Sequence, residues 1–246
     1  SVKTHLDLFS GIGGFALAAG WAGYRTVGFC VIEDYPRRIL SKRFPSVRLH
    51  GDIRELDGSA YRGVTLITGG YPCQPFSQAG KRQGAADDRH LWPEMLRVVK
   101  QARPSWVLAE NVAGHITMGL DQVLADLEGE GYACRAVVIP ACAVNAPHRR
   151  DRVWIIAKSL ADSGSGRRQG GKLQAGRHEP GLCGTDVADF PSLGYEKIGS
   201  SYWETEPDVG RVADGISHRV DRLRGLGNAI VPQVAYELIR HLEVHG

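Results

Sequence analysis

Short apolar stretches alternate with longer amphipathic stretches along most of the chain. The short ones have the length and composition of buried strands, and the longer ones carry apolar residues at helical spacing. The predicted strands cover residues 4–9, 26–32, 47–50, 64–67, 106–109, 133–139 and 152–157. The predicted helices cover residues 15–22, 35–44, 91–101, 120–130 and 233–242. Strands that alternate with helices predict an α/β fold with a doubly wound, mostly parallel sheet.

The alternation stops after residue 157. Residues 160–201 are rich in Gly, Ser, Arg and Gln and show little periodicity, which is typical of a long loop or a minimal accessory region. We therefore expect three parts: a first domain over residues 1–158, a short irregular region over 159–210, and a C-terminal segment over 211–246 whose helix returns to the first domain.

The length and composition of the chain are those of a globular protein of modest size. The chain has 246 residues, 43% apolar and 23% charged, with a net charge of +3, which is enough for one α/β domain and a small appendage. Basic residues are concentrated between residues 145 and 177. This segment could bind a polyanion, or it could be a solvated basic loop.

Five cysteines form no closely spaced pair and no zinc pattern; they are Cys30, Cys73, Cys134, Cys142 and Cys183. An odd number of unpaired cysteines suits a reducing compartment. No apolar stretch approaches the roughly 20 residues that span a bilayer, and no signal-peptide pattern is present. We expect a cytoplasmic protein with no membrane partner and no metal.

Cys73 lies between Pro72 and Pro75, just after the predicted strand 64–67. The surrounding glycines and prolines indicate a stiff turn at the end of a strand. A thiol in such a turn is poorly placed for core packing and well placed to attack a ligand, so Cys73 is a candidate nucleophile. The alternative is an inert loop cysteine.

Other polar residues follow further predicted strands. The glycine-rich turn at residues 10–14 joins the first strand to a helix, as in nucleotide-binding folds, although any tight turn needs glycine. Glu33 follows the second strand, where such folds place a ribose-binding acid. Asp52 follows the third and could bind an adenine amine or cap a turn. Glu110 follows the strand 106–109, at the same sheet edge as Cys73.

Two arginines are predicted to share one face of the strand 152–157. Alternation directs Arg150 and Arg152 to one side and Asp151 to the other. The pair could clamp an anion or lie on the surface. The polar segment 78–89, which contains Lys81 and Arg82, is a candidate loop for folding over a ligand.

Six motifs occur in a fixed order: DLFSGIGGF, GDI, GGYPCQPFS, ENV, PHRRDRVWIIA and GLGNAIVPQ. Together they resemble the DNA (cytosine-5) methyltransferase family over nearly the whole chain. The resemblance implies a Rossmann-like, S-adenosylmethionine-dependent fold. It also implies that residues 1–158 hold the catalytic and cofactor sites and that residues 159–210 recognise the target.

The implied reaction is methyl transfer from S-adenosylmethionine to carbon-5 of a cytosine flipped out of duplex DNA, leaving S-adenosylhomocysteine. Addition of the Cys73 thiolate at carbon-6 makes carbon-5 nucleophilic. A protonated Glu110 would donate to ring nitrogen 3, and burial would raise its pKa in the required direction. By resemblance, Arg152 contacts the base carbonyl, and Arg150 steadies the catalytic loop and the target phosphates.

The resemblance also assigns binding residues. The implied cofactor contacts are Phe9, Gly11, Ile12, Gly13, Gly14, Ile32, Glu33, Asp52, Ile53, Pro72, Leu91, Asn228, Ala229 and Ile230. The implied DNA contacts are Gln74, Ser77, Lys81, Arg82, Arg89, Asn111 and Arg149. The expected partner is double-stranded DNA, bound by a monomer in a bacterium or a phage-infected host cell, as in restriction–modification.

Two departures from the family pattern keep alternatives open. Val31 stands where the family usually has an acid for the cofactor ribose, and the region 159–210 is short for target recognition. One alternative is an RNA-directed relative. Another is a DNA-binding protein with weak cofactor affinity and no turnover. A nicotinamide-dependent oxidoreductase would fit the glycine turn but leaves the Pro-Cys-Gln and Glu-Asn-Val motifs unexplained.

Overall fold

A computed structural model describes residues 2–72, 91–146, 148–161 and 229–244. Its strands are β1 (Thr4–Leu8), β2 (Arg25–Cys30), β3 (Arg48–His50), β4 (Leu66–Gly69), β5 (Trp106–Val112), β6 (Tyr132–Pro140) and β7 (Asp151–Ser159). Its α-helices are α1 (Gly14–Trp21), α2 (Asp34–Arg43), α3 (Trp92–Ala102), α4 (His115–Met118), α5 (Leu120–Gly129) and α7 (Pro232–Val244). Short 3₁₀ helices are η1 (Ile53–Glu55), η2 (Gly58–Tyr61) and η3 (Ala141–Val144).

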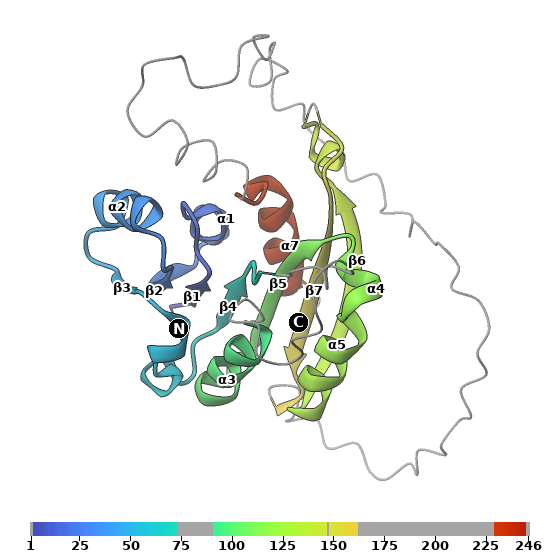
Figure 1. The fold of residues 1–246 in the computed structure, drawn as a ribbon, viewed down its shortest axis with the longest axis horizontal. Coiled ribbons are helices and arrows are strands. Elements are labelled where there is room, and N and C mark those ends of the chain that lie inside the picture. The colour runs from blue at the N-terminus through green and yellow to red at the C-terminus, as the bar shows by residue number, and fades with distance from the viewer. Residues whose placement is uncertain (1, 73–90, 147, 162–228, 245–246) are drawn as a thin grey trace, which may run out of the picture.

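The strands form one seven-stranded sheet in the order β3-β2-β1-β4-β5-β7-β6 (Figure 1). Neighbours from β3 to β5 pair in parallel, whereas β7 is antiparallel to both β5 and β6. The strand order reverses between β1 and β4, which is the switch point where ligands bind in such sheets. The predicted doubly wound, mostly parallel sheet is therefore confirmed.

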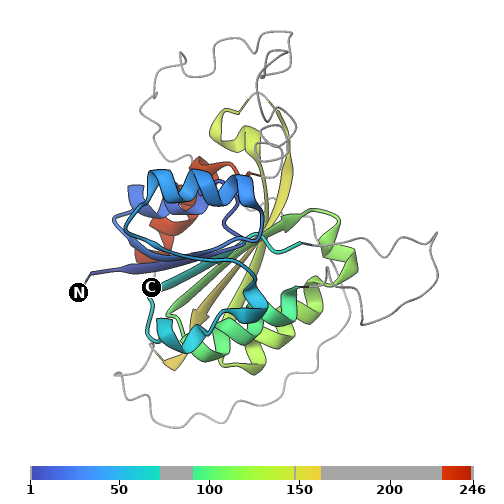
Figure 2. The same cartoon turned by 60° about the vertical axis from the view of Figure 1, so that its left-hand side comes forward.

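Helices cover both faces of the sheet, as Figure 2 shows with α1, α2 and α7 on one face and α3 and α5 on the other. On the α3–α5 face, Leu8, Met95 and Leu127 belong to one buried apolar cluster. On the α1–α7 face, Phe15 and Trp154 belong to another, with ring centroids 6.0 Å apart and nearly perpendicular planes. The two clusters sandwich the sheet and hold its strand ends in place.

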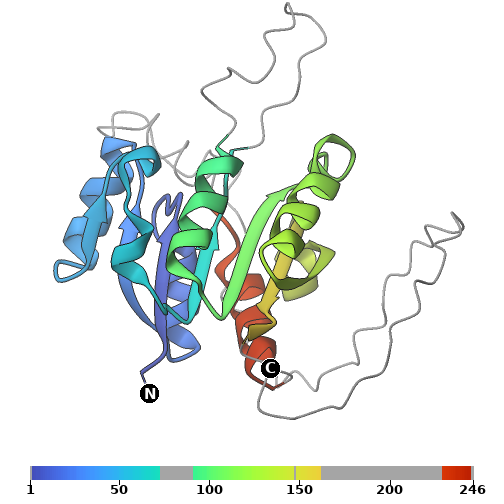
Figure 3. The same cartoon turned by 90° about the horizontal axis from the view of Figure 1, so that it is seen from below.

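Helix α7 packs on α1 although most of the chain separates the two. Ala235 and Ile239 are fully buried against Ala18 and Ala19. Figure 3 shows α7, in red, running back beside the sheet toward the edge where β1 begins. This helix therefore lies with the first domain, while the predicted region 159–210 falls almost wholly outside the described residues.

A line of polar groups is buried where β1, β2 and β4 pair. His5 Nε2 lies 2.8 Å from Thr68 Oγ1, and the Thr68 hydroxyl donates to Asp7 Oδ1 at 2.9 Å. His5 Nδ1 lies 3.0 Å from Thr26 Oγ1. Asp7, Thr68, His5 and Thr26 therefore form one continuous line of side-chain contacts across β4, β1 and β2.

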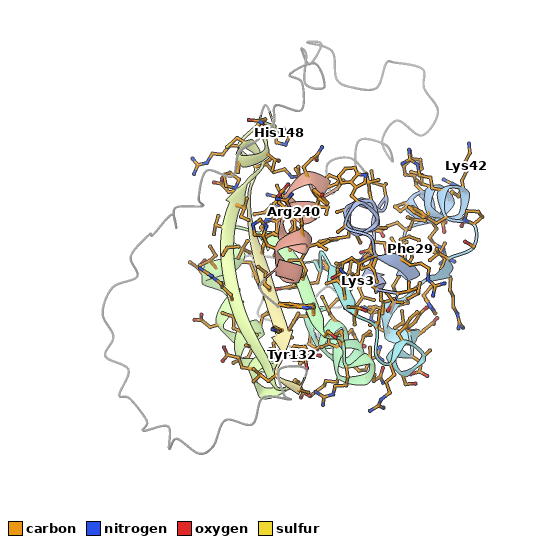
Figure 4. The ribbon with its side chains drawn as sticks, turned by 180° about the vertical axis from the view of Figure 1, so that it is seen from behind. Lys3, Phe29, Lys42, Tyr132, His148 and Arg240 are labelled. Atoms are coloured by element: carbon orange, nitrogen blue, oxygen red, sulfur yellow. The ribbon has the colours of Figure 1, made fainter. Side chains whose placement is uncertain are left out.

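Strands β6 and β7 form a long hairpin at one side of the sheet. Tyr132 and His148 are labelled at its opposite ends in Figure 4. The turn includes η3 and closes with a hydrogen bond from the Ala141 amide to the Arg149 carbonyl at 2.7 Å. In the described ranges, no helix is long and apolar enough to cross a membrane.

Candidate active site

The carboxyl ends of β1, β4 and β5 meet side by side at the switch point. In the register of the sheet, Leu8 pairs with Gly69, and Gly69 pairs with Ala109. The next residues along these strands therefore emerge together at one edge, and Glu110 is one of them. A Cβ atom built on Gly70 would lie 3.4 Å from Glu110 Oε2. The carboxyl group thus lies close to the backbone that leads toward Cys73.

Glu110 lies inside β5 rather than after its end, so the predicted strand 106–109 was too short. The reason is β7, which pairs with β5 as far as Val112 and extends the ladder. Arg152 of β7 donates from Nε to Glu110 Oε1 at 2.8 Å. Burial raises the pKa of Glu110, against the opposing effects of Arg152 and Arg150. The carboxyl group is therefore a stronger proton acceptor than an exposed Glu.

Arg152 lies on the Glu110 side of β7 and pairs with it. Arg150 precedes β7 and has a φ of 38°, so strand alternation does not set its direction, although its charge acts on Glu110. Burial lowers the pKa of Arg150, with a further lowering by Arg152 and an opposing effect from Glu110. Asp151 instead pairs with the exposed Arg149 at 2.9 Å. Arg150 Nη2 also donates to the Ala229 carbonyl at 2.9 Å, which ties the β7 entry to the segment before α7.

The turn between β1 and α1 is built on unusual backbone angles. Phe9, Gly11 and Gly13 have φ values of 55°, 50° and 92°, a region that favours glycine. Among the described residues, a Cβ on Gly11 would meet no atom within 4 Å. A Cβ on Gly14 would lie 2.8 Å from Ile230 Cγ1, so only glycine permits this close approach of the C-terminal segment.

The ends of β2 and β3 place the other predicted cofactor residues. Val31 is 4% exposed and packs with Phe29 and Leu40, so it points into the core under α2. Ile32 is 62% exposed. Glu33 is exposed and precedes α2 as its N-cap residue. Apolar and acidic side chains are thus both presented at this edge.

Asp52 is the N-cap residue of η1. Its carboxylate accepts from the Arg54 amide at 3.0 Å and pairs with Arg54 Nη1 at 3.4 Å. This is the capping role left open by the sequence, and its contact with adenine stays a prediction. Ile53 is 4% exposed and belongs to the core on the α3–α5 face, so its side chain faces inward.

The remaining predicted residues divide by position. Ile12, Leu91, Ala229 and Ile230 are partly buried, and Pro72 is exposed. Asn111 is 4% exposed, and its amide groups bond to the Tyr71 carbonyl and the Val112 amide, so its described partners are within the protein rather than at a DNA surface. Several predicted residues lie outside the described ranges: Cys73, Gln74, Ser77, Lys81, Arg82, Arg89 and Asn228.

Comparison with known proteins identifies the family to which this chain belongs. The family model of the C-5 cytosine-specific DNA methylase matches residues 4–164, which include the glycine turn, Glu110 and both arginines. The chain belongs to this family.

Relatives of the chain are bacterial type II methyltransferases. M.NgoMIV of Neisseria gonorrhoeae is 39% identical over 112 residues, which cover 45% of this chain and 36% of the relative. M1.HphI of Haemophilus parahaemolyticus is 32% identical over 207 residues, which cover 77% and 53%. The chain thus spans about half or less of the length of these relatives. The solved structure of the S. pombe Dnmt2 methyltransferase is 25% identical with a TM-score of 0.55, and the match covers 68% of this chain and 57% of that one.

The described residues fit the cofactor that the family implies. Within the described part of the chain, the glycine turn has room at Gly11, and the exposed Ile32 offers an apolar contact after β2. The carboxylate expected by family resemblance is replaced by the buried Val31, so Glu33 is the acidic group nearest in sequence. Among the described residues, no cluster of His, Cys, Asp and Glu could hold a metal ion.

Sequence reasoning did not single out Tyr71, His115 or Arg97. Tyr71 and His115 are both buried and lie beside the root of the Cys73 segment. Arg97 of α3 binds the carbonyls of Ile53 and Leu56. The one signal was the presence of polar side chains within otherwise apolar stretches, which does not reveal their partners.

Proposed function

We propose that the chain methylates carbon-5 of cytosine in double-stranded DNA, using S-adenosylmethionine. The observation that carries the proposal is the position of Glu110: a buried acid beside Gly70, three residues before Cys73, with Arg152 on its carboxylate. In the proposed reaction, Glu110 would be the proton donor to the ring, and the segment after Gly70 would supply the nucleophile. The C-5 cytosine family model matches this part of the chain.

The proposed nucleophile is Cys73. An unperturbed thiol with a pKa of about 8.5 is only a few per cent thiolate at neutral pH, so it needs activation by positive charge. Arg150 and Arg152 are the described cations at this edge of the sheet. Thiolate addition to carbon-6 of cytosine pushes electrons to carbon-5, which then takes the methyl group. Loss of the carbon-5 proton expels the thiolate and restores the ring.

Glu110 is the proposed partner of ring nitrogen 3. Its raised pKa favours the protonated form, which can donate a hydrogen bond as the ring gains electrons. The 2.8 Å contact with Arg152 acts against this rise in the pKa of Glu110. When a base enters, Arg152 would divide its donors between Glu110 and the base carbonyl.

S-adenosylmethionine, when bound, supplies the methyl group. The turn of Gly11 and Gly13 would hold its amino-acid part against the α1 amides. Ile32 and Phe9 would contact the adenine, and Asp52 would accept from its amino group. Ile230 closes the site over Gly14. The reaction would leave S-adenosylhomocysteine on the same residues.

The target base must leave the helix, at a cost of a few kcal/mol. The exposed Arg149 beside the site is a phosphate contact of this proposal. Binding through phosphates should weaken as salt rises.

The test uses duplex DNA containing 5-fluorocytosine, which blocks proton loss and traps the covalent complex. We expect a cofactor-dependent adduct with the full chain, its loss in Cys73→Ala, and its retention in the matched variant Cys142→Ala, whose cysteine is exposed on the β6–β7 turn. Glu110→Gln should slow the adduct about 100-fold or more. An adduct that survives in Cys73→Ala contradicts the mechanism.

Two further arms separate the alternatives. Transfer RNA tested at the same salt concentration should give less product than duplex DNA, and the reverse would identify an RNA-directed enzyme. Binding of DNA and cofactor without product would identify a DNA-binding protein with no turnover. In that case the buried Val31 would be the first position to examine.

A further inference from the structure

Tyr71 is held at both its backbone and its side chain, two residues before Cys73. Its carbonyl accepts from Asn111 Nδ2 at 3.1 Å. Its hydroxyl lies 2.7 Å from Nε2 of His115, in a buried hydrogen bond. Both partners come from one stretch, the end of β5 and the start of α4. Tyr71, which leads into the segment that contains Cys73, is therefore hydrogen-bonded to β5, the strand that carries Glu110, and to the residues that follow it.

His115 is packed on more than one side. It is 5% exposed, and its ring stands nearly perpendicular to the Tyr71 ring, at 79° with centroids 5.5 Å apart. A Cβ on Gly119 would lie 3.4 Å from its Cε1. The imidazole thus has little room to turn away, and the hydroxyl of Tyr71 has a defined direction.

Trp92 completes the arrangement from the other end of the segment. Its ring packs on Tyr71 with centroids 5.1 Å apart, and its Nε1 donates to Asp126 of α5 at 2.8 Å. Tyr71 precedes residues 73–90, which contain Cys73 and are called the nucleophile segment below, and Trp92 follows them. The residues that flank the nucleophile segment are therefore in contact. The hydrogen bond to His115 adds a polar contact at the hydroxyl of the ring that packs on Trp92.

We propose that Tyr71 and His115 are positioning residues that set the direction in which the chain leaves β4 and thereby aim the Cys73 thiol at the flipped base. This inference rests on the proposed function. A phenyl ring would fill the same space but would lose the hydroxyl–imidazole bond, leaving the backbone bond from Asn111 as the described tie to the Glu110 strand. A displacement of about 1 Å at a reacting atom can cost about 100-fold in rate.

The test measures single-turnover methylation and DNA affinity for Tyr71→Phe and His115→Ala. We expect each variant to lose about 10- to 100-fold in the rate of the chemical step, with DNA and cofactor affinities within about threefold of the parent chain. The matched control is Tyr132→Phe, which removes a buried hydroxyl bonded to the Pro104 carbonyl at 3.0 Å, far from the hairpin turn (Figure 4). It should keep the parent rate.

A double variant separates positioning from general loss of packing. If the two residues act as one unit, Tyr71→Phe with His115→Ala should be no slower than either single variant, whereas independent packing effects would multiply. His115→Gln, which can restore a hydrogen bond to the hydroxyl, should recover part of the rate. Multiplying effects, or equal slowing by Tyr132→Phe, would overturn the inference.

Formation of the 5-fluorocytosine adduct distinguishes failure of the proposed function from failure of the positioning role alone. Failure of the parent chain to form the adduct defeats the proposed function itself. A normal adduct in the parent chain together with an equally fast adduct in Tyr71→Phe defeats only the positioning role. Slow adduct formation in Tyr71→Phe, with the same melting temperature shift as Tyr132→Phe, supports it.

Discussion

Glu110 takes its proposed chemistry from its neighbours. It is 12% exposed, which raises its pKa, while Arg152 at 2.8 Å and Arg150 act in the opposite direction. The residue type alone predicts a charged surface acid. The balance of burial against two arginines is what suits it to exchange a proton with a base.

Asp7 and His5 are a second pair whose ionisation depends on burial. Desolvation raises the pKa of Asp7 to about 8, and it lowers the pKa of His5 to about 3. Both side chains are fully buried on β1 and are connected through Thr68. Near neutral pH both are therefore uncharged, and the line of hydrogen bonds beside the glycine turn holds no net charge.

This pair predicts a pH dependence of stability. Between its ordinary value of 3.8 and about 8, folded Asp7 keeps a proton that the unfolded chain releases, so the free energy of unfolding falls as pH rises. His5 acts in the opposite direction only below its ordinary value of 6.5, because there the unfolded chain takes up the proton. From pH 6.5 to 8 the effect of Asp7 is unopposed by His5, with a slope of at most about 1.4 kcal/mol per pH unit.

The measurement is chemical denaturation at several pH values across this window. Asp7→Asn should remove the downward slope, whatever its effect on stability at one pH. Asp121→Asn, at an exposed position on α5, should leave the slope unchanged. An equal slope in Asp7→Asn and the parent chain would contradict the assignment to Asp7.

At the scale of elements, Arg97 joins α3 to η1. Its guanidinium donates to the Ile53 carbonyl at 2.7 Å and to the Leu56 carbonyl at 2.9 Å, and its Nε pairs with Glu94 at 2.7 Å. The turn that presents Asp52 is therefore held by a helix that starts at the end of the nucleophile segment. Arg97 therefore connects the turn after Asp52 with the helix that follows residues 73–90.

We expect Arg97→Met to lower the free energy of unfolding by about 2–4 kcal/mol, because two carbonyls lose a charged donor. It should also weaken cofactor binding, since the Asp52 turn loses its support. Arg103→Met is the matched control: its exposed pair with Glu130 should contribute less than about 1 kcal/mol. Urea denaturation and calorimetry with S-adenosylmethionine would measure both effects. Equal losses in the two variants would argue against the proposed role.

Comparing predicted with observed element bounds shows what apolar periodicity can predict and what it cannot. A strand or helix is present at every predicted position, but several bounds differ: the strand predicted over 64–67 is β4 (Leu66–Gly69), and the one predicted over 26–32 is β2 (Arg25–Cys30). The predicted end of β5 was wrong because pairing with the antiparallel β7 extends it to Val112. Helix α4 was not predicted: it is four residues long, too short for a periodic pattern.

For the whole molecule, α7 is the element that joins the two ends of the chain into one core. Ile239 is fully buried among residues of α1 and the sheet. The helix also brings Ala229 to Arg150 and Ile230 to Gly14. Packing of the C-terminal helix is therefore linked to the contacts made at Arg150 and at the glycine turn.

Ile239→Ala should lower the free energy of unfolding by about 2–5 kcal/mol, the range for truncating a buried aliphatic side chain. Because α7 positions Ile230, the affinity for S-adenosylmethionine should fall as well. Arg240→Ala, on the exposed side of the same helix, should change stability by less than about 1 kcal/mol. Thermal unfolding with and without cofactor gives the comparison, and unchanged affinity in Ile239→Ala would separate α7 packing from the site.

The sequence by itself determined the fold class, the order of elements and the candidate chemistry. These follow from local features: apolar periodicity specifies strands and helices, glycine marks the left-handed turn, and six motifs in order indicate the family. Each motif and each periodic stretch is read within a short window, and the order of the motifs is read along the chain, so no knowledge of long-range contacts is needed.

Only the tertiary structure decided which side chains meet. Glu110 gains Arg152 because two antiparallel strands far apart in sequence pair in one register, and Tyr71 gains His115 because β4 and β5 end side by side. Tertiary packing also directs the Val31 side chain into the core and the Asn111 side chain toward Tyr71. Burial and distance set pKa values and hydrogen-bond partners, and both arise only when separate elements pack together.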